Sequence, residues 1–101
     1  MIVYNVTVSV DTSVVEEWLQ WMRGEHIPEV MATGCFEQYK LLKVLEDAPN
    51  PMSVTFAIQY HVADLTTLDS YLKHHAPSLR AKHQEKFQDK ALAFRTVLKE
   101  I

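Results

Sequence analysis

The sequence predicts an α+β protein in which helices cover one face of an antiparallel β-sheet. Residues 2–10 and 54–62 alternate between apolar and polar side chains, which is typical of strands with one buried face. Residues 13–33 and 64–87 carry apolar side chains at helical spacing, and a proline interrupts each of these segments. At 101 residues, the whole chain is expected to form one domain.

The first strand and the first helix follow from the N-terminal pattern. In the strand, one set of alternate positions is entirely apolar: Ile2, Tyr4, Val6, Val8 and Val10. Ser13 and Glu16 stand three residues apart, as in a capping box that begins a helix. This helix then presents one apolar stripe to the core, formed by Val15, Trp18, Leu19 and Met22.

Gly24 is expected to end or bend the first helix. Pro28 suits the first turn of a second helix at about residues 27–33, because its fixed φ is helical and its missing N–H is not needed there. Gly34 suits the left-handed residue that follows a helix. A second strand with a mixed pattern is predicted at residues 36–46, and "DAPNP" at 47–51 is the strongest turn signal in the chain.

The second half repeats the order of the first. After the strand at 54–62, Asp64 is the predicted N-cap of a helix whose stripe is Leu65, Leu68, Tyr71 or Leu72, and His75. Pro77 restarts a helix with one side formed by Leu79, His83 and Phe87. The last strand is expected to contain Leu92, Phe94, Thr96 and Leu98.

The resulting order is β-αα-β-β-αα-β, which is a ferredoxin-like arrangement of two split βαβ units. Right-handed crossovers place all helices on one face of a four-stranded antiparallel sheet with strand order 4-1-3-2. The other face is then left without a helical cover. We expect it to carry a polar cluster of Asn5, Gln59, His61 and, if Phe94 points inward, Arg95.

This uncovered face predicts self-association. Two such sheets packed across a two-fold axis would close a barrel-like homodimer, a dimeric α/β barrel. The polar cluster would suit a symmetric network at that interface, and equally a carboxylate or phosphate ligand. The alternative is a monomer whose sheet face is hydrated.

Charge and composition exclude several classes of protein. The net charge of −3 argues against a nucleic-acid-binding surface, which needs clustered lysine and arginine. The start Met-Ile-Val-Tyr-Asn does not resemble a signal peptide and no apolar run is long enough to span a membrane, so a cytoplasmic protein is predicted. Cys35 is the single cysteine, which excludes an intrachain disulfide, and neither a metal nor a cofactor is expected.

Several segments between Ile2 and Leu98 resemble a known family: "IVYNVTV", "WLQWM" followed by "HIPEVMATG", "IQY", "HAPSLRAKH" and "FRTVL". Together they are similar to the small bacterial proteins of domain-of-unknown-function family 4286, in the dimeric α/β-barrel superfamily. The resemblance implies a homodimer of ferredoxin-like protomers and no particular activity. Distant members of the superfamily include cofactor-independent quinol monooxygenases, haem-degrading enzymes and small isomerases, but no catalytic motif of theirs matches here residue by residue.

His26 is the first candidate for chemistry, because an imidazole can exchange a proton near neutral pH and this one lies between a glycine and a helix start. The side chains expected to line a ligand pocket with it are Tyr4, Trp18, Trp21, Met22 and His75. The structural alternative is that Trp18 and Met22 are core residues and that His26 hydrogen-bonds a helix end.

The sequence therefore predicts a small homodimeric protein that binds an aromatic or carboxylated molecule. Two other hypotheses remain open. One is an enzyme of the cofactor-independent monooxygenase or isomerase type, with His26 as acid or base. The other is a structural or regulatory dimer without a ligand.

Overall fold

Four strands form one antiparallel sheet in the computed structural model, which describes residues 1–45 and 51–101. They are β1 (Ile2–Asp11), β2 (Gln38–Lys43), β3 (Ser53–Val62) and β4 (Ala91–Lys99). Their order is β2-β3-β1-β4, so the predicted order and pairing are confirmed. The turn predicted at 47–51 lies, apart from Pro51, outside the described residues.

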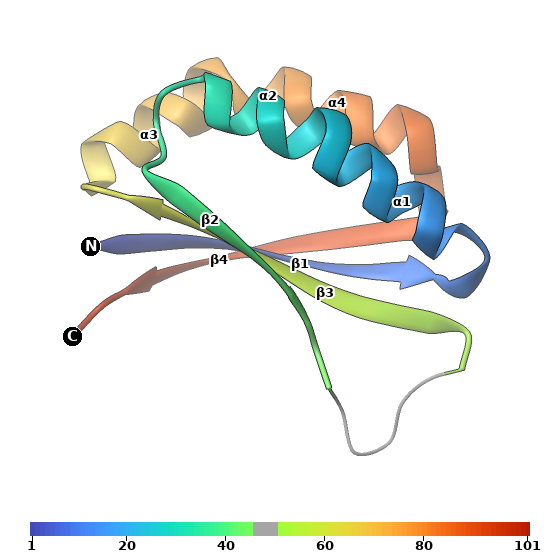
Figure 1. The fold of residues 1–101 in the computed structure, drawn as a ribbon. Helices are drawn as coiled ribbons and strands as arrows, with labels where there is room; N and C mark the ends of the chain where they lie inside the picture. Colours follow the sequence, from blue (N-terminus) through green and yellow to red (C-terminus); the bar gives the residue numbers. More distant parts are fainter. Residues whose placement is uncertain (46–50) are drawn as a thin grey trace.

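The helices form a single layer on one face of this sheet (Figure 1). The first crossover contains a 3₁₀ turn (Thr12–Val14), α1 (Val15–Trp21), a π-helical turn (Met22–His26) and α2 (Ile27–Ala32). The second contains α3 (Leu65–His74), α4 (Ala76–Phe87) and a 3₁₀ turn (Gln88–Lys90). The chain is therefore ferredoxin-like, as predicted.

Gly24 does not end the first helix. It lies in the π-helical turn, where the N–H of Ile27 donates to the carbonyl of Met22, and the helix continues into α2. Gly34 has a φ of 77°, which confirms the predicted left-handed position after α2. The capping box was wrong: the Asp11 carboxylate accepts from the N–H and the hydroxyl of Ser13 instead.

The second strand is shorter than the 36–46 predicted. β2 begins at Gln38, and Phe36 lies before it as a buried core residue. The strands β2, β3 and β1 alternate in register, so that Tyr39, Tyr60 and Tyr4 share the helix-covered face. The opposite face carries Lys40, Gln59 and Asn5 in the next row.

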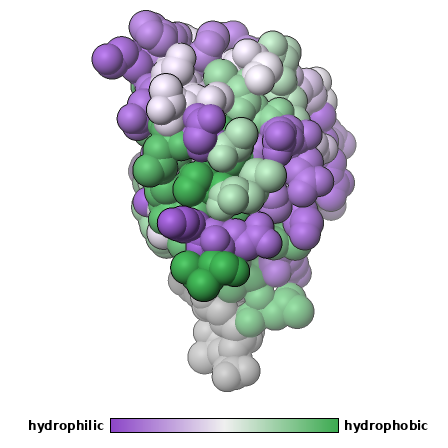
Figure 2. Space-filling view, turned by 90° about the vertical axis from the view of Figure 1, so that its left-hand side faces the viewer, coloured by the Kyte–Doolittle hydropathy of each residue, from purple (hydrophilic) through white to green (hydrophobic). Residues whose placement is uncertain are grey.

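The uncovered face mixes polar and apolar side chains. Register places Thr7 beside Phe94 and Ser9 beside Leu92, and both apolar side chains are about three-fifths exposed, at 62% and 60%. Viewed from the end at which both termini lie, the helical side at the top is mostly hydrophilic, while hydrophobic side chains gather lower down (Figure 2). The sheet side therefore exposes apolar surface that a small domain usually covers.

Arg95 is on the opposite face from the one expected. It pairs with Val6 on the helix-covered side, because Phe94 points outward rather than inward. Both sets of alternate positions on β4 contain apolar residues, so its sequence pattern does not distinguish its two faces. The neighbouring strand fixes the register and moves Arg95 out of the predicted polar cluster.

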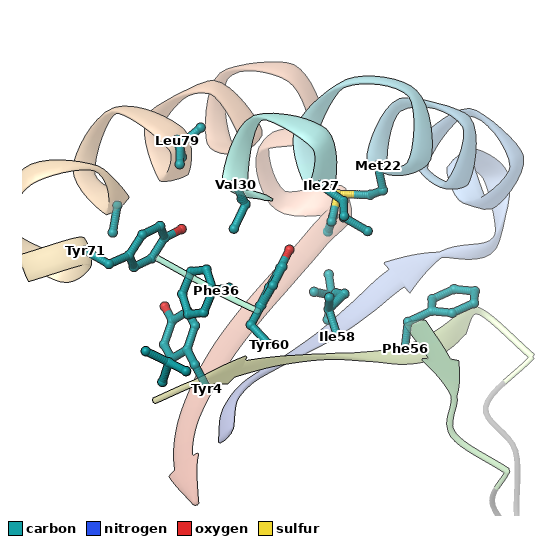
Figure 3. Close-up of a cluster of buried hydrophobic side chains, with 14 of the residues drawn as sticks. Tyr4, Met22, Ile27, Val30, Phe36, Phe56, Ile58, Tyr60, Tyr71 and Leu79 are labelled. Carbon is teal, nitrogen blue, oxygen red and sulfur yellow. The ribbon is translucent and has the colours of Figure 1, made fainter. Parts of the chain in front are cut away.

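The core lies between the sheet and the helices, and aromatic rings fill one end of it. Tyr4, Phe36, Tyr60 and Tyr71 are each buried, with ring centroids 4.7 to 6.3 Å apart in successive contacts. Figure 3 shows Tyr60 rising from β3 with its hydroxyl directed toward the helices. Phenol oxygens thus enter a region that is otherwise apolar, and this is where the candidate site lies.

Candidate ligand-binding site

A cavity lies between the helix layer and strands β1, β3 and β4. Apolar side chains supply much of its wall, and three kinds of polar group converge on it. Its lining residues are Tyr4, Val6, Val8, Met22, His26, Val30, Ile58, Tyr60, Tyr71, Leu79, Arg80, His83, Ala93 and Arg95. A partly apolar cavity with a few convergent polar groups is the usual form of a small-molecule site.

His26 enters this cavity from the π-helical turn. π-turns within helices widen the backbone locally and occur frequently at functional sites. The His26 ring stacks on Trp21, with centroids 5.0 Å apart and an angle of 27° between the planes. Its Nδ1 is buried and has no hydrogen-bond partner within the described parts of the chain. Such an atom costs free energy unless a ligand or water satisfies it.

Burial, and after it the neighbouring His83, lowers the pKa of His26 to about 4. The Glu29 carboxylate acts in the opposite direction, and Arg95 and Lys82 reinforce the lowering. His26 is therefore neutral at pH 7, so its ring can accept a proton or a hydrogen bond but is a poor source of a proton.

His83 lines the cavity from α4 and is also buried. The indole N–H of Trp18 donates to its Nε2 at 3.0 Å. Burial lowers the pKa of His83, and the Arg95 guanidinium lowers it further, so this imidazole is also neutral near pH 7. The rings of His26 and His83 lie 6.0 Å apart between centroids.

Two guanidinium groups complete the polar lining. Arg80 donates through Nη2 to the hydroxyl of Tyr4 at 2.9 Å. Arg95 lines the same cavity as His26, His83 and Tyr71, and its positive charge lowers the pKa of all three. Burial raises the pKa of both Tyr60 and Tyr71, which keeps these phenols neutral. No aspartate or glutamate belongs to the lining in residues 1–45 and 51–101, so the fixed charge of the cavity is positive.

The cavity is small. The space open to the centres of water molecules is about 30 Å³. One water needs roughly 10 to 15 Å³ by this measure, and a cavity of about 150 Å³ is known to hold benzene. The enclosed part therefore admits a few non-hydrogen atoms, and an aromatic ring does not fit unless lining side chains move.

The structure brings some of the predicted pocket residues together and separates others. Tyr4, Met22 and His26 line the cavity. Trp18 is fully buried in the core and stacks on Phe56, with centroids 5.0 Å apart. Trp21 lies behind His26, and His75 lines a separate shallow hollow between α2 and α4.

Two polar residues that line the cavity, His83 and Arg80, were not among the pocket residues predicted from the sequence. His83 was assigned to the apolar side of its helix, which is correct, but its bond to Trp18 joins residues 65 positions apart. Arg80 follows Leu79 on a helix rich in charged residues, so nothing in its neighbours distinguishes it from a solvent-exposed residue. Long-range pairing, which no local pattern reveals, places both at the site.

The remaining predicted residues lie on the uncovered sheet face. Asn5 and Gln59 are cross-strand partners, and His61 pairs with Val3 in the next row of that face. Asn5 donates through its amide to Thr7 Oγ1 at 3.0 Å, and Gln38 contacts His61 Nδ1 at 3.2 Å. These three polar residues therefore share the face predicted for them, while Arg95 does not.

Comparison with known families places the chain in a family but indicates no reaction. A family model described as "Domain of unknown function (DUF4286)" matches residues 1–101. This chain belongs to that family. No match was found among curated proteins. In the described residues, no helix is long and apolar enough to cross a membrane, and no three histidine, cysteine or acidic side chains are grouped to hold a metal.

Solved structures similar to this family member share its fold at low sequence identity. An ethyl tert-butyl ether d (ethd) family protein from Bacillus halodurans has 14% identity and a TM-score of 0.71, with 100% of both chains covered. HapK from Hahella chejuensis has 11% identity and a TM-score of 0.70, covering 100% of this chain and 93% of its own. A dimeric ferredoxin-like protein from an uncultured marine organism has 8% identity and a TM-score of 0.54, with 99% and 98% covered.

Proposed function

We propose that this protein is a homodimer whose protomers each bind a small carboxylic acid in the cavity between helices and sheet. The observation that carries the ligand assignment is the charge of the lining. Arg80 and Arg95 are present, and no acidic side chain of the described chain opposes them there. A guanidinium binds a carboxylate through two parallel hydrogen bonds, which makes this group the best match.

Size restricts the ligand further. Arg80 and Arg95 are both exposed along part of their length, so a carboxylate can remain at the open mouth. The enclosed space of about 30 Å³ then takes a short chain behind it. This favours acids of two to four carbons over the aromatic alternative of the sequence-based hypothesis.

Binding can be tested by following backbone amide shifts in NMR during titration with acetate, propionate and benzoate. We expect propionate to shift residues around the cavity and benzoate to bind more weakly. The variant Arg95→Gln should raise the Kd about tenfold or more, since a charge-assisted hydrogen bond contributes about 1.5 to 3 kcal/mol.

Arg23→Gln is the matched control, because Arg23 is exposed beside the outer hollow of α1 and not at the cavity. It should leave the Kd unchanged. Equal weakening by both substitutions would indicate a general effect of charge and would contradict a specific site. The absence of shifts around the cavity at millimolar concentrations of every acid would overturn the proposal.

The uncovered sheet face supports the dimer. Apolar side chains there include Leu42, Leu92, Phe94 and Leu98, between 42% and 62% exposed, beside the Asn5 and Gln59 pair. The similar fold that is described as dimeric adds support without sharing sequence. Phe94→Glu should convert the dimer to a monomer in light scattering, because a charge at the interface would be buried without a partner. A wild-type mass of 11.7 kDa at high concentration would contradict the dimer.

A second candidate function is proton-transfer catalysis, favoured by the unpartnered Nδ1 of His26 in the cavity. Because its pKa is about 4, His26 would act as a weak base rather than as an acid. Quinol oxidation and sugar-anomer exchange are suitable first assays. Activity that is equal in His26→Gln and in the wild type would remove this role.

A further inference from the structure

The hydrogen bond from Trp18 determines which ring nitrogen of His83 carries a proton. An indole N–H can donate but cannot accept. Trp18 is fully buried, and its N–H reaches His83 Nε2 at 3.0 Å. Nε2 must therefore be the acceptor and carry no proton. In a neutral imidazole, the single proton then resides on Nδ1.

The bond lies in a largely buried place. Trp18 has 0% exposure, so its N–H is not in contact with bulk solvent, and His83 has only 9% exposure. The charged form of His83 would add a second proton at Nε2 and lose the bond to Trp18. The nearby Arg95 charge also opposes that form. His83 is therefore held as a donor at Nδ1.

His26 supplies the complementary side of the cavity. Its Nδ1 is buried and unpartnered among the described residues. With 6.0 Å between the two ring centroids, the imidazoles make no direct hydrogen bond in the described structure. One oxygen atom between them, bonded at about 2.9 Å to each ring, is compatible with this separation. Arg95 lines the same small cavity as both rings, so a carboxylate held by Arg95 can place a neighbouring oxygen between them.

We propose that the cavity selects carboxylic acids that carry an oxygen substituent next to the carboxylate, with that oxygen accepting the Nδ1 proton of His83 and contacting His26. This inference rests on the proposed carboxylate site and defines its substrate class as 2-hydroxy or 2-oxo acids. An acid without the oxygen leaves the buried His26 Nδ1 without the partner that it also lacks among the described residues, which is why the site discriminates against it.

The first test concerns His83 alone and needs no ligand. Long-range ¹H–¹⁵N NMR spectra of the histidine rings at pH 7 distinguish the two tautomers. The expected result is the Nδ1–H tautomer for His83. Observation of the Nε2–H tautomer or of a charged ring would overturn the inference, whether or not carboxylates bind.

The second test compares lactate, pyruvate and propionate, which have the same carbon chain. Lactate or pyruvate should bind at least tenfold more tightly than propionate, since one hydrogen bond of about 1.4 kcal/mol corresponds to that ratio. Preference for lactate would indicate a hydroxyl that also donates to His26, and preference for pyruvate an oxo group. Equal binding of all three would overturn the inference and leave the carboxylate site intact. Failure of all three to bind would overturn both.

Two substitutions of His83 provide the matched control. In His83→Gln the amide can accept from Trp18 and still donate toward the cavity. We therefore expect lactate or pyruvate still to bind more tightly than propionate. In His83→Met the side-chain volume is similar but the donor is lost, so lactate, pyruvate and propionate should bind about equally. A methionine variant that still prefers lactate or pyruvate would contradict the role of His83, provided its far-ultraviolet circular dichroism matches that of the wild type.

Discussion

The two faces of the sheet are built from the same strands, yet they differ in almost every physical property. On the helix-covered face, Phe56 is 5% exposed and stacks on Trp18. On the uncovered face, Phe94 is 62% exposed. Polar groups differ too: phenols of the covered face meet imidazoles of the helix layer at a cavity, whereas Asn5 and Gln59 lie on the uncovered face. One face is thus suited to a small ligand and the other to a second copy of the chain.

The largest expected difference in stability between the two faces concerns the two phenylalanines. Phe56→Ala should cost about 3 to 5 kcal/mol in free energy of unfolding, because it leaves a cavity beside Trp18. Phe94→Ala should cost less than about 1 kcal/mol in dilute protein, where the face is not covered. Urea denaturation at nanomolar and micromolar concentrations measures both. If the Phe94 cost does not grow with concentration, that face does not bind a second copy.

The next effect depends on pH. The pKa of His26 is about 4 in the folded protein and near 6.5 in the unfolded chain, so protons bind the unfolded chain preferentially between these values. Stability is therefore full above pH 6.5 and falls as the pH decreases toward 4. By pH 5 the loss from His26 is at most about 2 kcal/mol. His26→Gln should show a shallower decrease in urea midpoint from pH 7 to 5, and an equal slope would contradict the burial of this imidazole.

A smaller effect distinguishes the two tryptophans. Trp18→Phe keeps an aromatic side chain, although a smaller one, and removes the donor to His83 Nε2, which should cost about 1 to 3 kcal/mol because that buried acceptor loses its partner. Trp21→Phe is the control, since the Trp21 ring is half-buried and its role is to stack on His26. Thermal unfolding should show the larger decrease in Tm for Trp18→Phe. The reverse order would mean that the bond to His83 contributes little.

The smallest effect is expected on the outer side of the helices. Lys82 donates to Glu29 at 2.8 Å, but the lysine side chain is 56% exposed. Exposed ion pairs contribute about 0 to 1 kcal/mol, so Lys82→Gln should change the urea midpoint little and lose any effect in 0.5 M salt. A cost as large as that of Trp18→Phe would show that this surface contact, and not the covered face alone, holds the helix layer in place.

Much of this architecture could be predicted because it depends on local patterns. The alternation of Ile2 to Val10 and of residues 54–62 identified two strands and their buried sides. Right-handed crossovers then fixed the strand order that the structure shows. The left-handed conformation of Gly34 followed from the absence of a Cβ at a helix end. Each of these rules acts over a few residues or on the connection between elements.

The site needed the tertiary structure, because its geometry arises from residues far apart in the chain. The sequence itself determined that His26 lies between Gly24 and Pro28, but its place in the cavity came from a π-helical turn in a continuous helix. Arg95 could be assigned to a face only after β1 fixed the register of β4, because alternation in β4 is ambiguous. Trp18 makes His83 Nε2 an acceptor across 65 positions, because packing buries Trp18 fully and His83 almost fully around this bond. Local sequence thus determined the strands and helices, while long-range packing decided which polar groups meet without solvent between them.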